Sequence, residues 1–224
     1  MDAMIDAVGE LFALVFRAAT FEPAAHAQLA RLEHMQRLAF LVPFLAGASE
    51  MAGQSATLVL NRVPRVRFAA SLVVTGLIYI LTALIWALST LFLAHRLELA
   101  SAPIGVVSAV IAVSFGPRLL GVLTIAPYYG EFLGRLLDGW MIAVAAFGIH
   151  IAVGLSGPLA ALCSVLGWTV WIILRDGADR LLGPFIRYLE KAVMGAPLDL
   201  SFDNIEDIVR RRFTQSEEER RGDD

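Results

Sequence analysis

The sequence is poor in charged side chains. They make up 17% of the 224 residues, whereas 58% of the residues are hydrophobic. Soluble globular domains average about 25% charged residues and about 45–50% apolar ones. A water-soluble fold of this length could not bury such an apolar excess. The composition therefore argues against a soluble enzyme domain and predicts that lipid is the solvent for much of the chain.

Cysteine is nearly absent, and so are the motifs of catalytic and metal sites. The single cysteine, Cys163, rules out a disulfide framework within the chain. The net charge of -3, with no basic stripe interleaved with aromatic residues, predicts no nucleic-acid partner. No Gly-x-Ser-x-Gly elbow and no phosphate-binding glycine loop occur. The four histidines also lack metal-ligand spacing. We therefore predict no catalytic residue, no cofactor, no metal and no enzymatic activity.

Long apolar runs are the dominant positive feature. A bilayer core of about 30 Å requires about 20 apolar helical residues. Residues 68–94 carry no charged side chain and predict one membrane span. Residues 140–155, which continue a polar helix start at Glu131, predict a second span, and residues 158–174 predict a third, shorter one. Tryptophans in these runs, Trp86, Trp140, Trp168 and Trp171, are expected to lie at the membrane interface or in packing contacts.

Two further runs are interrupted by polar residues. Residues 38–60 contain Glu50 near the middle, and residues 104–126 contain Gly116-Pro117-Arg118. A central acid or arginine costs about 2.5–3.5 kcal/mol on insertion, while each Leu, Ile or Val returns about 0.3–0.6 kcal/mol. Both runs therefore need protein neighbours, as interior or broken, partly re-entrant helices. We predict an all-α polytopic transmembrane bundle of four to five spans, one broken at Gly-Pro, with amphipathic flanking helices.

The flanks of the bundle are amphipathic. Within residues 3–16 the apolar side chains recur at helical spacing, which predicts a helix lying on the membrane interface with this stripe in lipid. Glu22-Pro23 is expected to end it, and residues 24–37 to form a second, more polar helix. The stripe comprises Met4, Val8, Leu11, Phe12 and Val15.

The same reasoning divides the chain into four parts. We expect N-terminal interfacial helices at 1–36, a transmembrane domain at 37–175, an amphipathic cytoplasmic extension at 176–213 and a charged, disordered tail at 214–224.

The distribution of arginine predicts the topology. Arg62, Arg65 and Arg67 would share one side of the membrane with the basic residues of 175–191, and the positive-inside rule makes that side cytoplasmic. The C-terminus is then cytoplasmic, and the N-terminus lies outside with five spans or inside with four. Because arginine and alanine dominate and Lys191 is the sole lysine, the composition suits a GC-rich bacterial genome. We predict a multi-pass protein of the bacterial cytoplasmic (inner) membrane.

The order of these features resembles the bacterial branch of the Yip1-domain family. The residues that carry the resemblance are Phe21-Glu22-Pro23, the segment 44–63, the uncharged span 68–94, the segment 107–123 and the segment 136–174. The resemblance implies five membrane helices. Eukaryotic members of the family act in vesicle traffic and bind small GTPases through a cytosolic N-terminal segment.

Glu50 and Arg118 are the most informative single residues, because ionisable groups at membrane depth face partners or water. They could form a proton or ion path, or a structural pair that closes the bundle. Since both lie in runs too polar to stand alone, we predict that the two runs pack together with these charges in direct or one-water contact. Arg135 and Asp138 share a helical face with Glu131 and are expected to pair locally. His150, alone in an apolar run, is expected to be a hydrogen-bonded packing residue.

These features favour a non-enzymatic membrane scaffold that binds or organises other membrane proteins. The alternative is a small transporter or channel that uses Glu50, Arg118 and the broken run 104–126. The two halves of the chain show no convincing self-similarity, which favours the scaffold. The expected partners are the lipid bilayer and either another membrane protein or further copies of the chain.

Overall fold

A computed structural model describes residues 2–60, 65–96, 103–125 and 129–173, and these residues are helical with no β-strand. By its internal contacts the chain divides into two compact units, Met1–Gly177 and Ala178–Asp224. The second unit lies outside the described residues. The predicted amphipathic extension and the predicted charged tail also lie outside the described residues.

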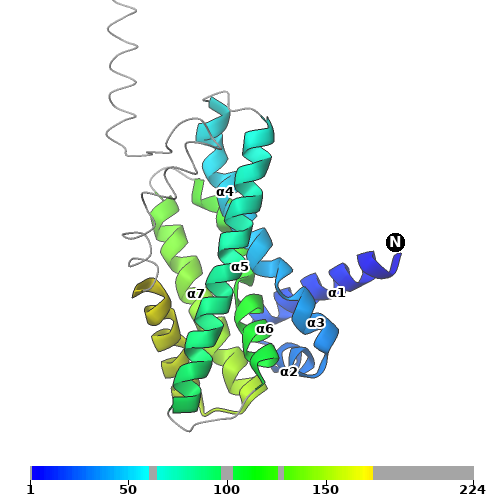
Figure 1. The fold of residues 1–224 in the computed structure, drawn as a ribbon, viewed down its shortest axis with the longest axis vertical. Helices are drawn as coiled ribbons and strands as arrows, with labels where there is room; N and C mark the ends of the chain where they lie inside the picture. The colour runs from blue at the N-terminus through cyan, green and yellow to red at the C-terminus, as the bar shows by residue number, and fades with distance from the viewer. Residues whose placement is uncertain (1, 61–64, 97–102, 126–128, 174–224) are drawn as a thin grey trace, which may run out of the picture. The chain divides into compact units, whose positions relative to one another are not determined.

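Three described helices are long and apolar enough to cross a membrane (Figure 1). They are Phe68–Arg96 within α5 (Arg65–Arg96), Ile104–Thr124 within α6 (Ile104–Ser114) and η1 (Gly116–Ile125), and α7 (Gly130–Val153). Gly157–Ile173 forms a shorter apolar helix. The predicted all-helical fold is thus confirmed, with three helices that could cross a membrane, and the fourth and fifth spans are not confirmed.

Helix α4 (Leu41–Leu60) accounts for the first interrupted run and packs side by side with α5 (Figure 1). Two glycines permit this close approach. A Cβ atom at Gly47 would lie 2.8 Å from the carbonyl oxygen of Thr75, and one at Gly76 would lie 2.6 Å from the ring of Phe44. Small residues at these crossings let the two backbones approach each other, as in many membrane helix pairs.

The second interrupted run breaks at the predicted place. Helix α6 is buried from Val106 to Ser114 and ends there, and the 3-10 helix η1 begins at Gly116. Pro117 has no N–H group, and its ring would clash with the carbonyl four residues earlier, so an α-helix cannot continue without a kink. The backbone winds into the tighter 3-10 helix instead, and the Arg118 N–H donates to the Phe115 carbonyl, three residues earlier, at 2.9 Å. At 10 residues η1 is long for a 3-10 helix, most of which run for about three or four residues.

The N-terminal segment folds into three helices, α1 (Asp2–Ala19), α2 (Pro23–Arg31) and α3 (Glu33–Leu38). The expected stop at Glu22-Pro23 is present, with Pro23 as the first residue of α2 and an Arg17–Glu22 ion pair of 2.7 Å across the turn. The prediction of one helix over 24–37 is wrong, because Leu32 adopts an extended conformation and separates α2 from α3.

Part of the stripe on α1 faces the protein, and the side chain of Met4 lies outside the described residues. Leu11 is 1% exposed and Val15 is similarly buried, and a Cβ atom at Gly116 would lie 2.8 Å from the Val15 side chain. Phe12 is partly exposed, and Phe16 is 72% exposed on a neighbouring face. The prediction that Leu11 and Val15 lie in lipid is therefore wrong. An amphipathic pattern shows that one face is covered, but it does not distinguish lipid from protein as the cover.

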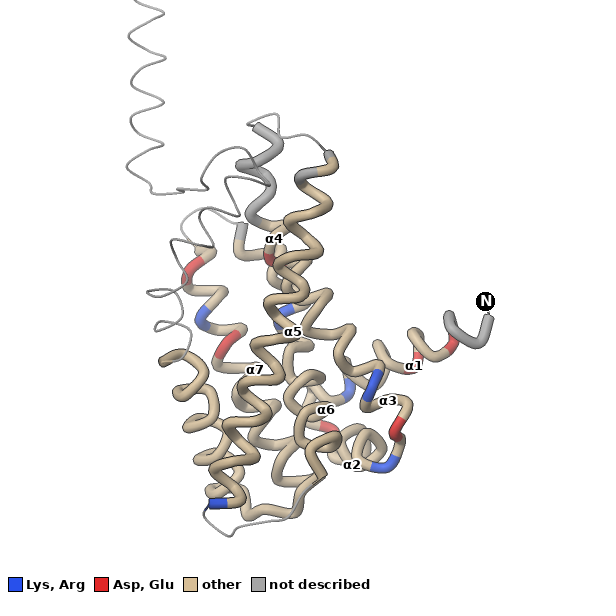
Figure 2. Tube along the Cα trace, in the orientation of Figure 1, with Lys and Arg blue, Asp and Glu red and all other residues tan. Residues whose placement is uncertain are grey.

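Charged residues gather on α1–α3 and on the first half of α7, whereas α5 is almost free of them along its length (Figure 2). Aromatic contacts join α5 to Phe115 and Trp168. The ring of Phe115 contacts Tyr79 and Trp86 edge-on, and Trp86 meets Trp168 at 5.0 Å between ring centroids. Trp86 is fully buried and donates its indole N–H to the Ser164 carbonyl at 3.0 Å. Trp86 is therefore a packing residue of the core.

A charged cluster at the helix break

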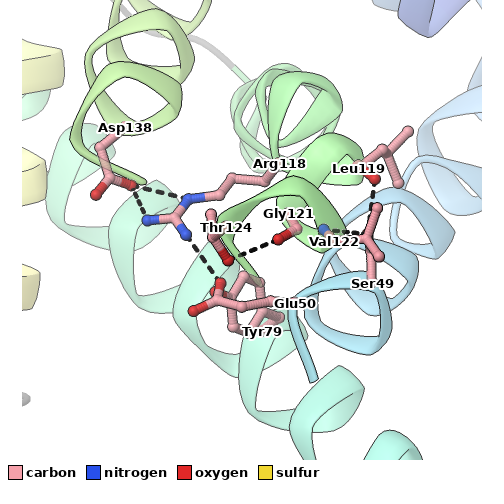
Figure 3. A network of polar contacts seen from close by, with 9 residues as sticks. All are labelled: Ser49, Glu50, Tyr79, Arg118, Leu119, Gly121, Val122, Thr124 and Asp138. Carbon is pink, nitrogen blue, oxygen red and sulfur yellow. Dashed lines mark hydrogen bonds and ion pairs between the residues drawn. The ribbon is translucent and has the colours of Figure 1, made fainter. Parts of the chain in front are cut away.

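Arg118 stands at the start of η1, immediately after the proline that breaks the helix, and its guanidinium reaches two carboxylates from two other helices (Figure 3). Its Nη1 lies 2.8 Å from Oε2 of Glu50 on α4. Its Nε donates to Oδ1 of Asp138 on α7 at 2.9 Å, and Nη2 contacts the same oxygen. The structure thus places Glu50 and Arg118 in direct contact and adds Asp138 as a second partner.

Tyr79 completes the arrangement from the fourth element. Its hydroxyl, on α5, donates to the same Glu50 oxygen that accepts from Arg118. We call these four residues (Glu50, Tyr79, Arg118 and Asp138) the charged cluster. It joins α4, α5, η1 and α7 through side chains alone.

The local sequence brings α4 against η1 closely enough for these contacts. A Cβ atom at Gly121 would lie 3.3 Å from the Cα of Glu50, and one at Gly53 would lie 3.1 Å from the Cα of Val122. Ser49 fastens the same crossing, because its Oγ donates to the Leu119 carbonyl at 2.7 Å and accepts from the Val122 N–H at 3.1 Å. The hydroxyl therefore satisfies backbone groups at the irregular turn after Pro117.

The cluster holds one guanidinium and two carboxylates, a formal charge of -1. The side chains of Arg118, Glu50 and Asp138 are 13%, 24% and 32% exposed, so the arginine is the most enclosed of the three. A guanidinium offers five N–H donors in a planar fork that suits carboxylates on two sides. Here Nε, Nη1 and Nη2 all contact carboxylate oxygens. The geometry can hold helices together.

The other sequence-predicted residues lie apart from the cluster. Arg135 pairs with Glu131, and both side chains are largely exposed, about 80% each. Asp138 does not join that pair, since its carboxylate turns toward Arg118. Nδ1 of His150 contacts the Leu155 carbonyl just beyond the end of α7. Among the residues that the structure describes, no three His, Cys, Asp or Glu side chains are grouped to hold a metal ion.

Tyr79 and Ser49 were not predicted from the sequence to take part in this site. Tyr79 is the one tyrosine in the uncharged run 68–94, and a lone phenol in such a run is a usable signal because it needs a hydrogen-bond partner when buried. Ser49 gives a weaker signal, which is its position next to Glu50 in the same apolar run.

Comparisons of the chain with protein-family models, with curated proteins and with solved structures found no match. The assignment of roles to the residues of the cluster therefore depends on their geometry.

Replacing Ser49 by alanine tests the fastening of α4 to η1. The change leaves the Leu119 carbonyl and the Val122 N–H without this partner, and such losses cost about 1–3 kcal/mol when the groups are enclosed. We expect Ser49→Ala to lower the free energy of unfolding in mild detergent by about 1 kcal/mol, measured by urea unfolding. Thr169→Ala is the matched control, because the Thr169 hydroxyl donates to a carbonyl of its own helix on an exposed face. Equal losses in the two variants would contradict a special role for Ser49.

Proposed function

We propose that the chain is a non-enzymatic membrane scaffold of the Yip1 type, a protein that binds and organises other membrane proteins. The observation that carries the proposal is the way the charged cluster is used. Its charges contact one another across three elements, and the Tyr79 hydroxyl adds the fourth, so the cluster supplies a rigid frame instead of an open polar site. A frame of this kind suits a protein whose function is to present a fixed surface to partners.

The outer face of α5 supports the same proposal. It presents exposed aliphatic and aromatic side chains over most of the helix, with no charged residue among them: Val73, Val74, Leu77, Ile78, Leu81, Leu84, Leu88 and Phe92. A face of this composition can contact lipid tails or an apolar helix of another membrane protein. We propose a second membrane protein or another copy of the chain as the partner.

The proposal includes the number of membrane spans and the orientation of the chain in the membrane. We propose that α4 and the helix Gly157–Ile173 complete a bundle of four to five spans in a bacterial inner membrane, sheltered by the three longer helices. Of the basic residues that carry the orientation argument, Arg65 and Arg67 lie at the start of α5, whereas Arg62 and those of 175–191 lie outside the described residues. With them on the inner side, the C-terminus is cytoplasmic.

One observation favours a second candidate, a small transporter or channel. The apolar run is discontinuous at Gly116-Pro117, and the charged cluster lies beside the break. Discontinuous helices with charged groups at the break are a recurring feature of transport sites. In this reading Glu50 and Asp138 would exchange Arg118 for a transported cation or proton.

Purification in native lipid separates the two functions. A tagged chain extracted with a lipid-solubilising polymer should carry a membrane protein in stoichiometric amount, or a defined number of its own copies, and should not conduct ions after reconstitution in liposomes. A matched extraction from cells that express an unrelated tagged membrane protein identifies nonspecific passengers. A monomer without partners that moves ions in liposomes would contradict the scaffold and support the transporter.

A further inference from the structure

His26 is the most enclosed ionisable residue in the N-terminal helices. It lies on α2 with 0% of its surface exposed. Its ring meets the ring of Phe147 on α7 edge-on, at 5.6 Å between centroids. A Cβ atom at Gly148 would lie 2.6 Å from Nδ1 of His26 and 2.7 Å from Val110 on α6. The imidazole is therefore inserted where the N-terminal helices meet the bundle, in a space that glycine at 148 leaves open.

The surroundings of His26 suit a neutral ring. Within the part of the chain that the structure describes, neither ring nitrogen has a hydrogen-bond partner of ordinary geometry. Burial lowers the pKa of His26 below its ordinary value, and the backbone carbonyl of Ala18 opposes this shift only in part. Protonation would place a charge in an enclosed site where the Ala18 carbonyl offsets only part of the cost of burial, which is unfavourable.

Among the described residues, the elements that pack around His26 bring no enclosed countercharge to it. Helix α6 contains no titratable residue. On α7 the nearest titratable residue along the chain is His150, which contacts the Leu155 carbonyl. On the α1 side Arg17 and Glu22 pair with each other. The remaining charged or titratable residues of α2 and α3, namely Arg31, Glu33, His34 and Arg37, are exposed.

We propose that His26 is a pH-sensitive lock between the N-terminal helices and the bundle, and that its protonation releases α1–α3. The other contacts that dock this segment include the apolar side chains around Leu11, Leu14 and Leu29 and the edge-on contact of Phe21 with Phe147. They also include a hydrogen bond of 2.9 Å from the Trp140 indole to the Ala19 carbonyl. Release uncovers this apolar face, so the lock would couple acidity to exposure of a binding surface. This inference does not depend on the scaffold function.

The sign of the pH dependence follows from linkage. A histidine that is kept neutral in the docked state binds its proton more readily in the released state. Above a pH of about 6.5 both states are neutral, and docking is at full strength. As the pH falls below about 6.5, the released state gains a proton that the docked state does not bind. The docking equilibrium then weakens by up to about tenfold per pH unit, until the docked state also becomes protonated.

The lock can be tested by hydrogen exchange in lipid nanodiscs, measured by mass spectrometry at about pH 7.5 and about pH 5.5. The labelling times are corrected for the intrinsic exchange rates at each pH. We expect backbone protection in α1–α3 to fall by up to about tenfold at the lower pH, while peptides of α5 keep theirs. His26→Phe and His26→Leu cannot take up a proton and should abolish the difference. His34→Gln, which changes an exposed histidine on α3, should behave as the wild type.

Three outcomes would overturn the proposal. The first is protection in the wild type that does not depend on pH, a result that needs no variant to fold. The second is a fall that persists in a folded His26 variant. The third is a fall that includes α5, which would indicate general unfolding instead of release.

Discussion

Replacing Arg118 by glutamine is expected to lower the stability of the bundle more than replacing either of its acidic partners. The change leaves the carboxylates of Glu50 and Asp138 near each other with no cation between them. Loss of one partner from an enclosed charge pair costs about 3–5 kcal/mol. Because the three side chains are partly exposed, we expect a loss near the lower limit, about 3 kcal/mol, in the free energy of unfolding measured in mild detergent.

The acidic partners supply the control. In Glu50→Gln and in Asp138→Asn the guanidinium keeps one carboxylate, so each variant should lose less than Arg118→Gln. Adding Glu50→Gln to Arg118→Gln should recover part of the loss, because it removes one of the two unpaired carboxylates. Additive losses, or equal losses in all three single variants, would be inconsistent with a cluster centred on Arg118.

Replacing Gly47 by alanine is expected to have the next largest effect. The new Cβ atom would lie 2.8 Å from a backbone oxygen of α5 and 2.9 Å from the ring of Tyr79, so α4 and α5 must move apart. Overpacking of this kind costs about 1–3 kcal/mol, and we expect about 2 kcal/mol together with a weakened Tyr79–Glu50 contact. Thermal unfolding in detergent, followed by circular dichroism, gives the loss.

Gly134 on α7 is the matched control for Gly47. No atom lies within 4 Å of a Cβ atom placed there, so Gly134→Ala should be neutral or should stabilise the protein by up to about 1 kcal/mol. If the Gly47→Ala and Gly134→Ala proteins melt at the same temperature, the α4–α5 crossing must be looser than the 2.8 Å approach at Gly47 implies.

The features that depend on local sequence were predictable. The uncharged run 68–94 lies within one long helix, and the break after Ser114 follows from Pro117. The contact between Glu50 and Arg118 was anticipated because two runs too polar to face lipid must shelter each other. The helix break follows from the ring of Pro117. The other two features follow from the cost of a polar group in an apolar solvent, and composition shows where that cost arises.

The features that depend on packing between distant residues were not predictable in the same way. The spacing of Asp138 suggested a local partner, yet Arg118 provides stronger pairing and Asp138 turns to it. The stripe of α1 indicated an apolar environment, but Gly116 lets Val15 pack on the bundle and makes that environment protein. The enclosure of His26 depends on Gly148, a residue far away in sequence with no chemical signal of its own.

We propose that the charged cluster is a structural frame and not a path for ions. The most direct measurement uses Glu50→Gln/Arg118→Gln/Asp138→Asn, which removes all three charges together. Buried ion pairs can often be replaced by neutral groups without loss of the fold. We therefore expect this variant to fold, to co-purify in native lipid with the same subunits as the wild type and to resemble it in a liposome flux assay. A wild type that moves ions in liposomes, beside a folded neutral variant that does not, would contradict the claim.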